Sequence, residues 1–210
     1  SMTTERTKAV NALTALLRVN DLGIDARKPL TRTQITTVTT WRTRKEEIAQ
    51  SVARTEAIRL ARRIVNLDQD LKTNETQLTE LIKASPAAPL LQETGFGPVS
   101  TAICFAAWSH HGRVHSQAAY ASLAGVSPIP ASSGNTVRHR LNRGGDRKLN
   151  KALHMVAITR MTHDPETKAY VEKRRAQGRT TKEIRRTLKR YLARKVYRIL
   201  NNQNPSQNSA

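Results

Sequence analysis

Apolar residues recur at helical spacing through the N-terminal part of the chain. Between residues 3 and 20 they fall three or four positions apart, the pattern of an amphipathic helix that Gly23 is placed to end. Residues 31–44 are rich in threonine and valine, which favours a strand, but helical patterns flank the segment on both sides. We therefore expect a short helix there.

The next segment carries a heptad repeat. Residues 44–83 contain neither proline nor glycine, so we expect one helix of about 40 residues. Its seam positions alternate steps of four and three: Ala53, Ala57, Leu60, Ile64, Leu67, Leu71, Asn74, Leu78 and Leu81. The seam could pack on the chain's own first helix as a long hairpin or join two chains as a coiled coil, and the pattern favours neither. Asn74 lies where a polar side chain can fix register or oligomeric state.

Two prolines in "ASPAAP" mark a boundary near residues 84–89. Beyond it, the spacing of apolar residues predicts helices near residues 114–123, 146–162, 165–177 and 181–200. The glycines Gly95 and Gly97 form a turn ahead of a further helix, an order that matches a helix-hairpin-helix motif. In that motif the free N–H groups of the second helix bind a phosphate. Two packed helices that bind nothing would also need such a turn.

These patterns predict an all-α fold. We expect a long helical hairpin or coiled-coil arm over residues 1–84, which makes the protein a homo-oligomer through residues 44–83. A compact helical domain with the helix-hairpin-helix motif follows over residues 85–200. Residues 201–210 are polar and are expected to be a disordered tail.

Charge changes this picture by indicating a partner. The chain has 36 Lys and Arg against 16 Asp and Glu, a formal net charge of +20. Between residues 138 and 198 there are 20 Lys and Arg and five Asp and Glu, a net charge of +15. This excess favours a polyanion such as DNA or RNA as the ligand of the C-terminal part.

Other classes of protein are excluded or disfavoured. The single cysteine, Cys104, lies in the apolar run "AICFAAW", so we expect a buried thiol, no disulfide and a reducing cytoplasm. No apolar run reaches roughly 18 residues, which argues against a membrane partner. The histidines of "SHHGRVH" straddle a glycine at a helix boundary, so we expect no metal site there.

The stretch "PASSGNTVRHRLNRGG" combines a serine loop with arginines. A serine hydroxyl can attack a phosphodiester when guanidinium groups surround the phosphate and neutralise its charge. Ser132 and Ser133 precede Gly134, and Arg138, Arg140 and Arg143 follow within about ten residues. Serine, glycine and asparagine are also ordinary turn residues, so the pattern alone leaves both interpretations open.

The sequence resembles a known family. The stretches that carry the resemblance are "TGFGPVSTA", "YASLAGVSPIPASSG", "RHRLNRGGDRKLNKALH" and "RRAQGRTTKEIRRTLKRYLARKVYRIL". Together they are similar to the C-terminal transposase domain of the IS110 family, the insertion-sequence transposases with DEDD acidic residues and a serine. The resemblance covers nearly all of residues 85–200. Residues 1–84 resemble the linker that precedes that domain only in being helical with a coiled-coil pattern.

The resemblance implies roles for particular residues. The nucleophilic serine stands immediately before the loop glycine, which is Ser133 here, with Ser132 as the fallback if the register differs by one. Gly95 and Gly97 match the hairpin turn. The basic residues after the loop are implied to face nucleic acid: Arg138, Arg140, Arg143, Arg147 and Lys148.

The resemblance also implies partners. Family members act as dimers or tetramers, use a structured RNA to choose DNA sites, and place a divalent metal in an N-terminal ribonuclease-H-like domain with acidic residues. That domain is absent from this sequence, so we expect a fragment of a transposase that holds no cofactor itself and is inactive alone. The alternative is a non-catalytic helical nucleic-acid-binding module with a dimerising arm.

Overall fold

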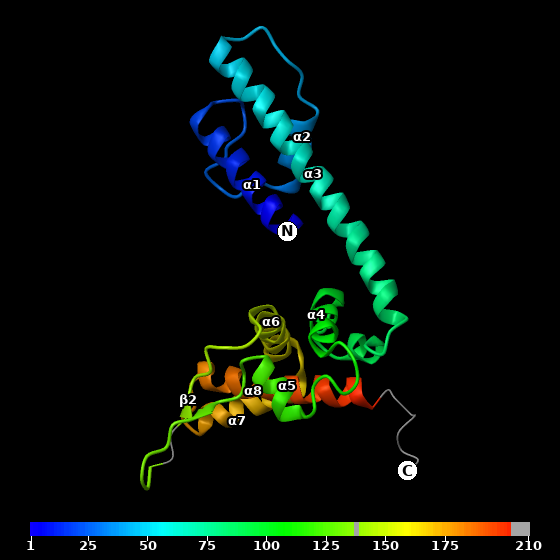
Figure 1. Cartoon of the computed structure of the whole chain (residues 1–210). Helices are drawn as coiled ribbons and strands as arrows, with labels where there is room; N and C mark the ends of the chain where they lie inside the picture. Colours follow the sequence, from blue (N-terminus) through cyan, green and yellow to red (C-terminus); the bar gives the residue numbers. More distant parts are fainter. Residues whose placement is uncertain (137–138, 203–210) are drawn as a thin grey trace. The chain divides into compact units, whose positions relative to one another are not determined.

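The structure, a computed structural model, describes residues 1–136 and 139–202. It divides into two compact units, Ser1–Gln77 and Leu78–Ala210. Each unit has a hydrophobic cluster of its own, and helix α3 (Ile48–Lys83) runs through the division (Figure 1). The sequence predicts that a helical arm ends at residue 84 and that a separate domain begins at residue 85, and this boundary stays a prediction.

The first unit packs three helices: α1 (Met2–Val19), α2 (Arg32–Thr39) and the first part of α3. Leu13 of α1, Val38 of α2 and Ile64 of α3 are fully buried in one cluster. A capping box begins α2, because the Thr31 hydroxyl accepts a hydrogen bond from the Gln34 N–H while the Gln34 side chain accepts one from the Thr31 N–H. This cap and the buried face explain why a threonine-rich stretch forms the predicted short helix.

Helix α3 begins at Ile48, later than the predicted residue 44. Arg54 is 5% exposed; its guanidinium donates to Glu46 Oε2 at 2.8 Å and lies over the Trp41 ring, 5.0 Å from the ring centroid. Residues eight apart in one helix are separated by about 12 Å along its axis. Glu46 therefore reaches Arg54 only because the chain before Ile48 is not helical, and the predicted start of this helix is wrong.

The seam of α3 is partly buried and partly exposed. Ala57 and Ile64 belong to the cluster of the first unit, together with residues of α1 and α2. Leu78 packs on the cluster of the second unit. Asn74 is exposed and Leu81 is 69% exposed. The first part of the seam therefore packs within one chain, while the two-chain coiled coil stays a prediction.

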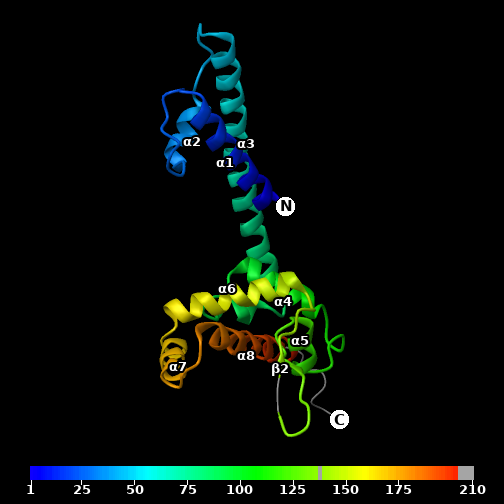
Figure 2. The same cartoon turned by 90° about the vertical axis from the view of Figure 1, so that its left-hand side faces the viewer.

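The second unit is a helical body with one short hairpin. Its elements are the 3-10 helix η1 (Ala88–Gln92), α4 (Pro98–Trp108), α5 (Gln117–Leu123), β1 (Ile129–Pro130), β2 (His139–Arg140), α6 (Arg147–His163), α7 (Pro165–Ala176) and α8 (Thr181–Asn201). Helix α8 contacts α4, α5, α6 and α7, and α6 lies beside it (Figure 2). Its predicted apolar face is buried, since Ile184, Leu192 and Val196 are at most 2% exposed.

A partly buried ion cluster ties the segment before α4 to α6 and α8. The Glu93 Oε2 accepts hydrogen bonds from Arg160 of α6 and Lys195 of α8, both at 2.6 Å. Arg160 is 9% exposed and also donates from Nε to the Thr94 carbonyl at 2.8 Å. Burial would raise the pKa of Glu93, but the hydrogen bonds from Lys195 and Arg160 outweigh it and lower that pKa.

The predicted helical fold is confirmed, but three details differ. The expected serine loop is a two-stranded antiparallel hairpin, so the fold is mostly helical and not all-α. Helix α5 begins after Ser116, whose hydroxyl accepts from the Ala119 N–H, and not at Val114, whose carbonyl accepts from Tyr197. The element before the turn at Gly95 is a five-residue 3-10 helix, so the helix-hairpin-helix motif is not confirmed. Residues 203–210 of the predicted tail lie outside the described residues.

Candidate nucleic-acid interface

The predicted serine loop forms a hairpin between α5 and α6. Strands β1 and β2 pair antiparallel, with Ile129 opposite Arg140 and Pro130 opposite His139. All four of these residues are exposed, and the hairpin extends beyond the helices of its unit (Figures 1 and 2). It is therefore a surface element that the helical body carries, and not part of the core.

Ser133 lies at the tip of this hairpin. It exchanges two backbone hydrogen bonds of 3.2 Å with Thr136 across the turn Gly134-Asn135. Gly134 has a φ of 56°, the positive value that a hairpin turn of this kind requires at its first central position. Ser132 and Ser133 are both exposed.

The two ends of the hairpin segment are fixed against each other by glycines. Gly125 and Gly145 both have positive φ, 63° and 90°. A Cβ on Gly145 would lie 2.6 Å from the Gly125 nitrogen and 2.6 Å from the Leu123 carbonyl oxygen. The Asp146 N–H donates to that Leu123 oxygen at 2.7 Å, and the Asn150 side chain donates to the Ala124 oxygen at 2.7 Å. Only glycine allows this approach of the α5 end to the α6 start.

Basic side chains gather at the start of α6. Asp146 caps the helix, because its Oδ1 accepts hydrogen bonds from the N–H groups of Lys148 and Leu149 at 2.7 and 3.0 Å. Arg143 and Arg147 are exposed and line a cavity of about 450 Å³ together with His154 and Lys189. Lys148 is exposed but does not line that cavity. Asp146 therefore satisfies the N–H groups of Lys148 and Leu149, and an anion there would meet the basic side chains.

Basic side chains concentrate where α6 faces α8, and among the described residues Lys189 and Arg185 form no ion pair there. Lys189 Nζ donates to the amide oxygen of Asn150 at 2.8 Å, and burial followed by Arg186 and Arg185 lowers its pKa. Burial, Lys189 and Arg185 likewise lower the pKa of His154. Among the described residues, the Nε of Arg185 is buried without a hydrogen-bond partner. Burial thus disfavours the charged forms of Lys189 and His154, and a bound anion would favour those charged forms.

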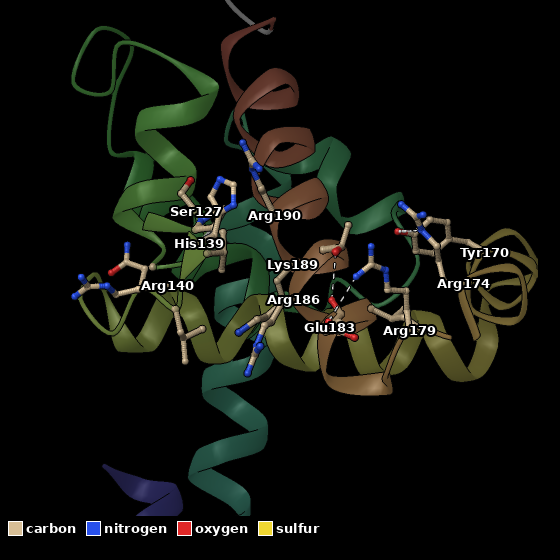
Figure 3. A pocket seen from close by; sticks show the side chains of 17 residues that line it. Ser127, His139, Arg140, Tyr170, Arg174, Arg179, Glu183, Arg186, Lys189 and Arg190 are labelled. Atoms are coloured by element: carbon tan, nitrogen blue, oxygen red, sulfur yellow. Dashed lines mark hydrogen bonds and ion pairs between the residues drawn. The ribbon is translucent and has the colours of Figure 1, made fainter. Parts of the chain in front are cut away.

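Arg140 lines a second and larger cavity of about 480 Å³ along α8, which we call the α8 groove (Figure 3). Its basic lining side chains are His139, Arg140, Arg174, Arg179, Arg186, Lys189 and Arg190. Lys189 lines both this groove and the cavity at the start of α6. The two cavities therefore share a cation between them.

The turn at Gly95 lies on another part of the surface. A Cβ on Gly95 would lie 3.0 Å from the Val156 carbonyl oxygen and 3.3 Å from Thr159 Cβ, so packing on α6 accounts for this glycine. Gly97 is exposed at the start of α4, with open space around its Cα. Val156 is nine residues beyond Arg147, about 14 Å along α6. The turn and the basic start of α6 are thus separate.

The structure brings together only some of the residues that the sequence singles out. Arg143 and Arg147 share one cavity, Arg140 lines the α8 groove, and Arg138 lies outside the described residues. The site prediction omits Lys189 and the arginines of α7 and α8 that line the groove. Their signal in the sequence is the basic rim of the last helix, whose charges recur on one side of an apolar face.

Other chemistry finds little support in the described part of the chain. No group of three or more His, Cys, Asp or Glu side chains there is arranged to hold a metal ion. None of the described helices is long and apolar enough to span a membrane. Cys104 is fully buried as predicted, and burial raises the pKa of its thiol to about 12.

Comparison with known proteins finds a transposase family model that matches part of this chain. Residues 87–172 match the family described as the Transposase IS116/IS110/IS902 family. The match includes α4, the hairpin and α6, and it ends within α7, before α8.

Two curated relatives are proteins of insertion elements. The chain is 31% identical to "Insertion element IS110 uncharacterized 43.6 kDa protein" of Streptomyces coelicolor over 123 residues, 58% of the chain and 30% of the relative. It is 27% identical to "Insertion element IS900 uncharacterized 42 kDa protein" of Mycobacterium paratuberculosis over 133 residues, 62% of the chain and 33% of the relative. Those aligned parts cover about a third of each relative.

Proposed function

We propose that the chain is the part of an insertion-sequence transposase that binds DNA and supplies Ser133 as the nucleophile for strand cleavage and rejoining. The transposase-family match over residues 87–172 is the observation that carries this proposal. An exposed serine at the tip of a hairpin within the matched segment supports it. The hairpin presents Ser133 to a bulky substrate without unfolding any helix.

The chemistry would be a transesterification at phosphorus. The Ser133 oxygen attacks the scissile phosphodiester, a phosphoseryl bond forms, and the bond from phosphorus to the leaving deoxyribose oxygen breaks. The serine proton passes to that leaving oxygen. Attack by another strand's hydroxyl on the phosphoserine reverses the step and rejoins DNA, so the energy of the phosphodiester is conserved.

The basic residues would hold the backbone of the nucleic acid. Arg143 and Arg147 line a cavity beside the hairpin base, and Arg140 belongs to the hairpin itself. Guanidinium groups neutralise phosphate charge and pair with its oxygens in two-pronged geometry. Arg138, Lys148, Gly95 and Gly97 are proposed as further contacts on the family resemblance alone.

The remaining components of the transposase are proposed from the same resemblance. An acidic ribonuclease-H-like domain of the longer transposase would bind the divalent metal, and a structured RNA would select the DNA. The exposed part of the α3 seam, with Asn74 and Leu81, would join chains into an oligomer. On this proposal the chain alone binds nucleic acid but does not recombine it.

The test compares two neighbouring serines in the full-length transposase. Ser133→Ala should abolish both strand exchange and the covalent protein–DNA adduct seen on a denaturing gel. Ser132→Ala is the matched control, since Ser132 is the neighbouring exposed serine of the same hairpin, and it should retain both. Loss with Ser132→Ala alone would move the nucleophile to Ser132, and wild-type exchange by Ser133→Ala would refute a serine nucleophile at that position.

A non-catalytic binding module is the second candidate. The tight turn after Ser133 gives the Ser-Gly-Asn sequence a purely conformational explanation. In that case Ser133→Ala leaves every activity of the longer protein intact, while binding to duplex DNA still falls steeply with salt because several phosphates are contacted.

A further inference from the structure

The α8 groove is too small for a double helix and has the size of a small-ligand site. Its volume of about 480 Å³ lies within the range of pockets that hold molecules the size of a nucleotide. Figure 3 shows its side chains in a row, from Ser127, His139 and Arg140 at one end to Tyr170 and Arg174 at the other. The groove could therefore follow one strand but could not enclose two.

The positive charge of the groove favours binding of a polyanion. In the described part of the chain its lining has six Lys and Arg side chains and one carboxylate, Glu183. That carboxylate is engaged elsewhere: its Oε2 accepts from the Thr180 N–H and hydroxyl, both at 2.9 Å, in the capping box of α8. Glu183 Oε1 is 3.8 Å from Arg179. Among the described residues, Arg186, Lys189 and Arg190 in the middle of the groove form no ion pair with this carboxylate, although Arg186 helps to lower the pKa of Glu183.

Lys189 gives the strongest sign that an anion belongs there. It is partly buried between α6 and α8, and its partner Asn150 is neutral. Burial and the neighbouring Arg186 and Arg185 lower its pKa, which means that its charged form is disfavoured as the chain stands. A phosphate in the groove would reverse that penalty for Lys189.

One end of the groove offers a flat surface for a base. The Arg174 guanidinium lies over the Tyr170 ring, with its carbon 5.4 Å from the ring centroid, and its Nε is 3.2 Å from the Tyr170 hydroxyl. A second hydrogen bond, to Gln177 Oε1 at 2.9 Å, fixes the guanidinium plane. Unpaired bases stack on aromatic rings and on arginine planes of this kind. At the hairpin end, Leu141 is 53% exposed and adds apolar surface for a sugar or base.

We propose that the α8 groove binds a single strand of nucleic acid, with phosphates on Arg186, Lys189 and Arg190 and a base stacked at the Tyr170–Arg174 pair. The proposal rests on the proposed function as a nucleic-acid-binding part of a transposase and adds a site outside the residues assigned there. Because His139 and Arg140 line the same groove, a bound strand would lie against the base of the hairpin that carries Ser133. DNA and RNA single strands share the chemistry that this site recognises.

The test measures binding of the whole chain to fluorescent single strands of about ten nucleotides, a length typical of such grooves. Uniform pyrimidine DNA, the corresponding RNA and a duplex are compared by fluorescence anisotropy over a salt series. Tyr170→Leu keeps the apolar packing of the partly buried side chain. It should weaken single-strand binding by roughly 5- to 150-fold, the range measured for loss of one stacked base, and leave duplex binding unchanged.

A charge-matched pair of double variants tests the backbone contacts. Arg186→Gln with Arg190→Gln should lower the slope of log affinity against log salt by about 1.4, about 0.7 for each lost phosphate contact on a single strand. The control, Lys173→Gln with Arg198→Gln, removes equal charge from exposed positions of α7 and α8 outside the groove and should keep the wild-type slope. Circular dichroism should show the same helical content in all variants.

Several outcomes would overturn the proposal. If the groove pair and the control pair lower the salt slope equally, the effect comes from the net charge of the chain and not from the groove. Equal weakening of duplex and single strand by Tyr170→Leu would remove the single-strand preference, and displacement by poly-glutamate at equal charge would indicate an acidic protein ligand instead. Preference for RNA or for DNA identifies the natural strand. If the groove variants bind single strands normally while strand exchange still requires Ser133, the groove proposal alone fails. If Ser133→Ala retains strand exchange while the groove variants lose single-strand binding, only the serine proposal fails.

Discussion

Replacing Glu93 by glutamine should destabilise the second unit far more than an ordinary surface substitution. The carboxylate accepts from both Arg160 and Lys195 at 2.6 Å, and these side chains are 10% and 27% exposed. Breaking a fully buried ion pair by removing one partner costs about 3–5 kcal/mol, and because the Glu93 and Lys195 side chains are 24% and 27% exposed we expect the lower end, about 3 kcal/mol. Glutamine has the same size, so the loss reports charge and not packing.

The control uses an exposed pair in the same unit. Glu172 contacts Arg175 at 2.9 Å, with side chains 71% and 49% exposed, so Glu172→Gln should cost about 0–1 kcal/mol. Urea unfolding is followed by tryptophan fluorescence in a Trp41→Phe background, where Trp108 reports the second unit alone. If Glu93→Gln lowers the free energy of unfolding by no more than Glu172→Gln does, this cluster is not a main support of the fold.

The pH dependence of the Glu93 effect has a definite sign. The pKa of Glu93 is lowered in the folded chain, because hydrogen bonds from Lys195 and Arg160 outweigh the effect of burial. Its stabilising contribution is therefore complete above the unfolded pKa of about 4.3 and is lost as the pH falls through the folded pKa. The free energies of unfolding of wild type and Glu93→Gln should differ by the full amount at pH 7 and converge as the pH falls.

Three further predictions concern other parts of the chain. Gly145→Ala should destabilise the second unit by more than Gly134→Ala, since both have positive φ but only Gly145 would place its Cβ 2.6 Å from backbone atoms; urea unfolding of the two variants measures the difference. Cys104 should resist alkylation at pH 8 in the folded chain, because its thiol is buried with a pKa near 12, and mass spectrometry should show modification only as urea unfolds it. Asn74→Leu should raise the mass measured by light scattering if the exposed seam joins chains, and an unchanged monomer would count against oligomerisation through it.

Helices were predictable because their signal is local. The apolar face of α8 is a periodic pattern within 21 residues, and the structure buries it as expected. Helix starts were less predictable where a distant contact decides them. The start of α3 depends on Arg54 meeting Glu46 and Trp41, and no pattern within the helix indicates that contact.

The hairpin and the groove could not be predicted for different physical reasons. Strands β1 and β2 have two residues each, too few for alternation to show, and β1 contains Pro130, which disfavours a strand. The α8 groove exists only after packing, since it joins residues as far apart in the chain as Gly125 and Arg190. The sequence indicated the excess of positive charge but not the face on which it gathers.

The glycine contact between Gly125 and Gly145 has a consequence for how this protein can change through evolution. The segment between them leaves the helical body and returns to the same point, so its length hardly affects the packing of α5 on α8. Closing a longer loop costs little, about 0.6 kcal/mol for each doubling of length. Insertions and substitutions there should therefore leave the stability of the helical body nearly unchanged, so the hairpin can diverge in sequence more freely than the helices that hold it.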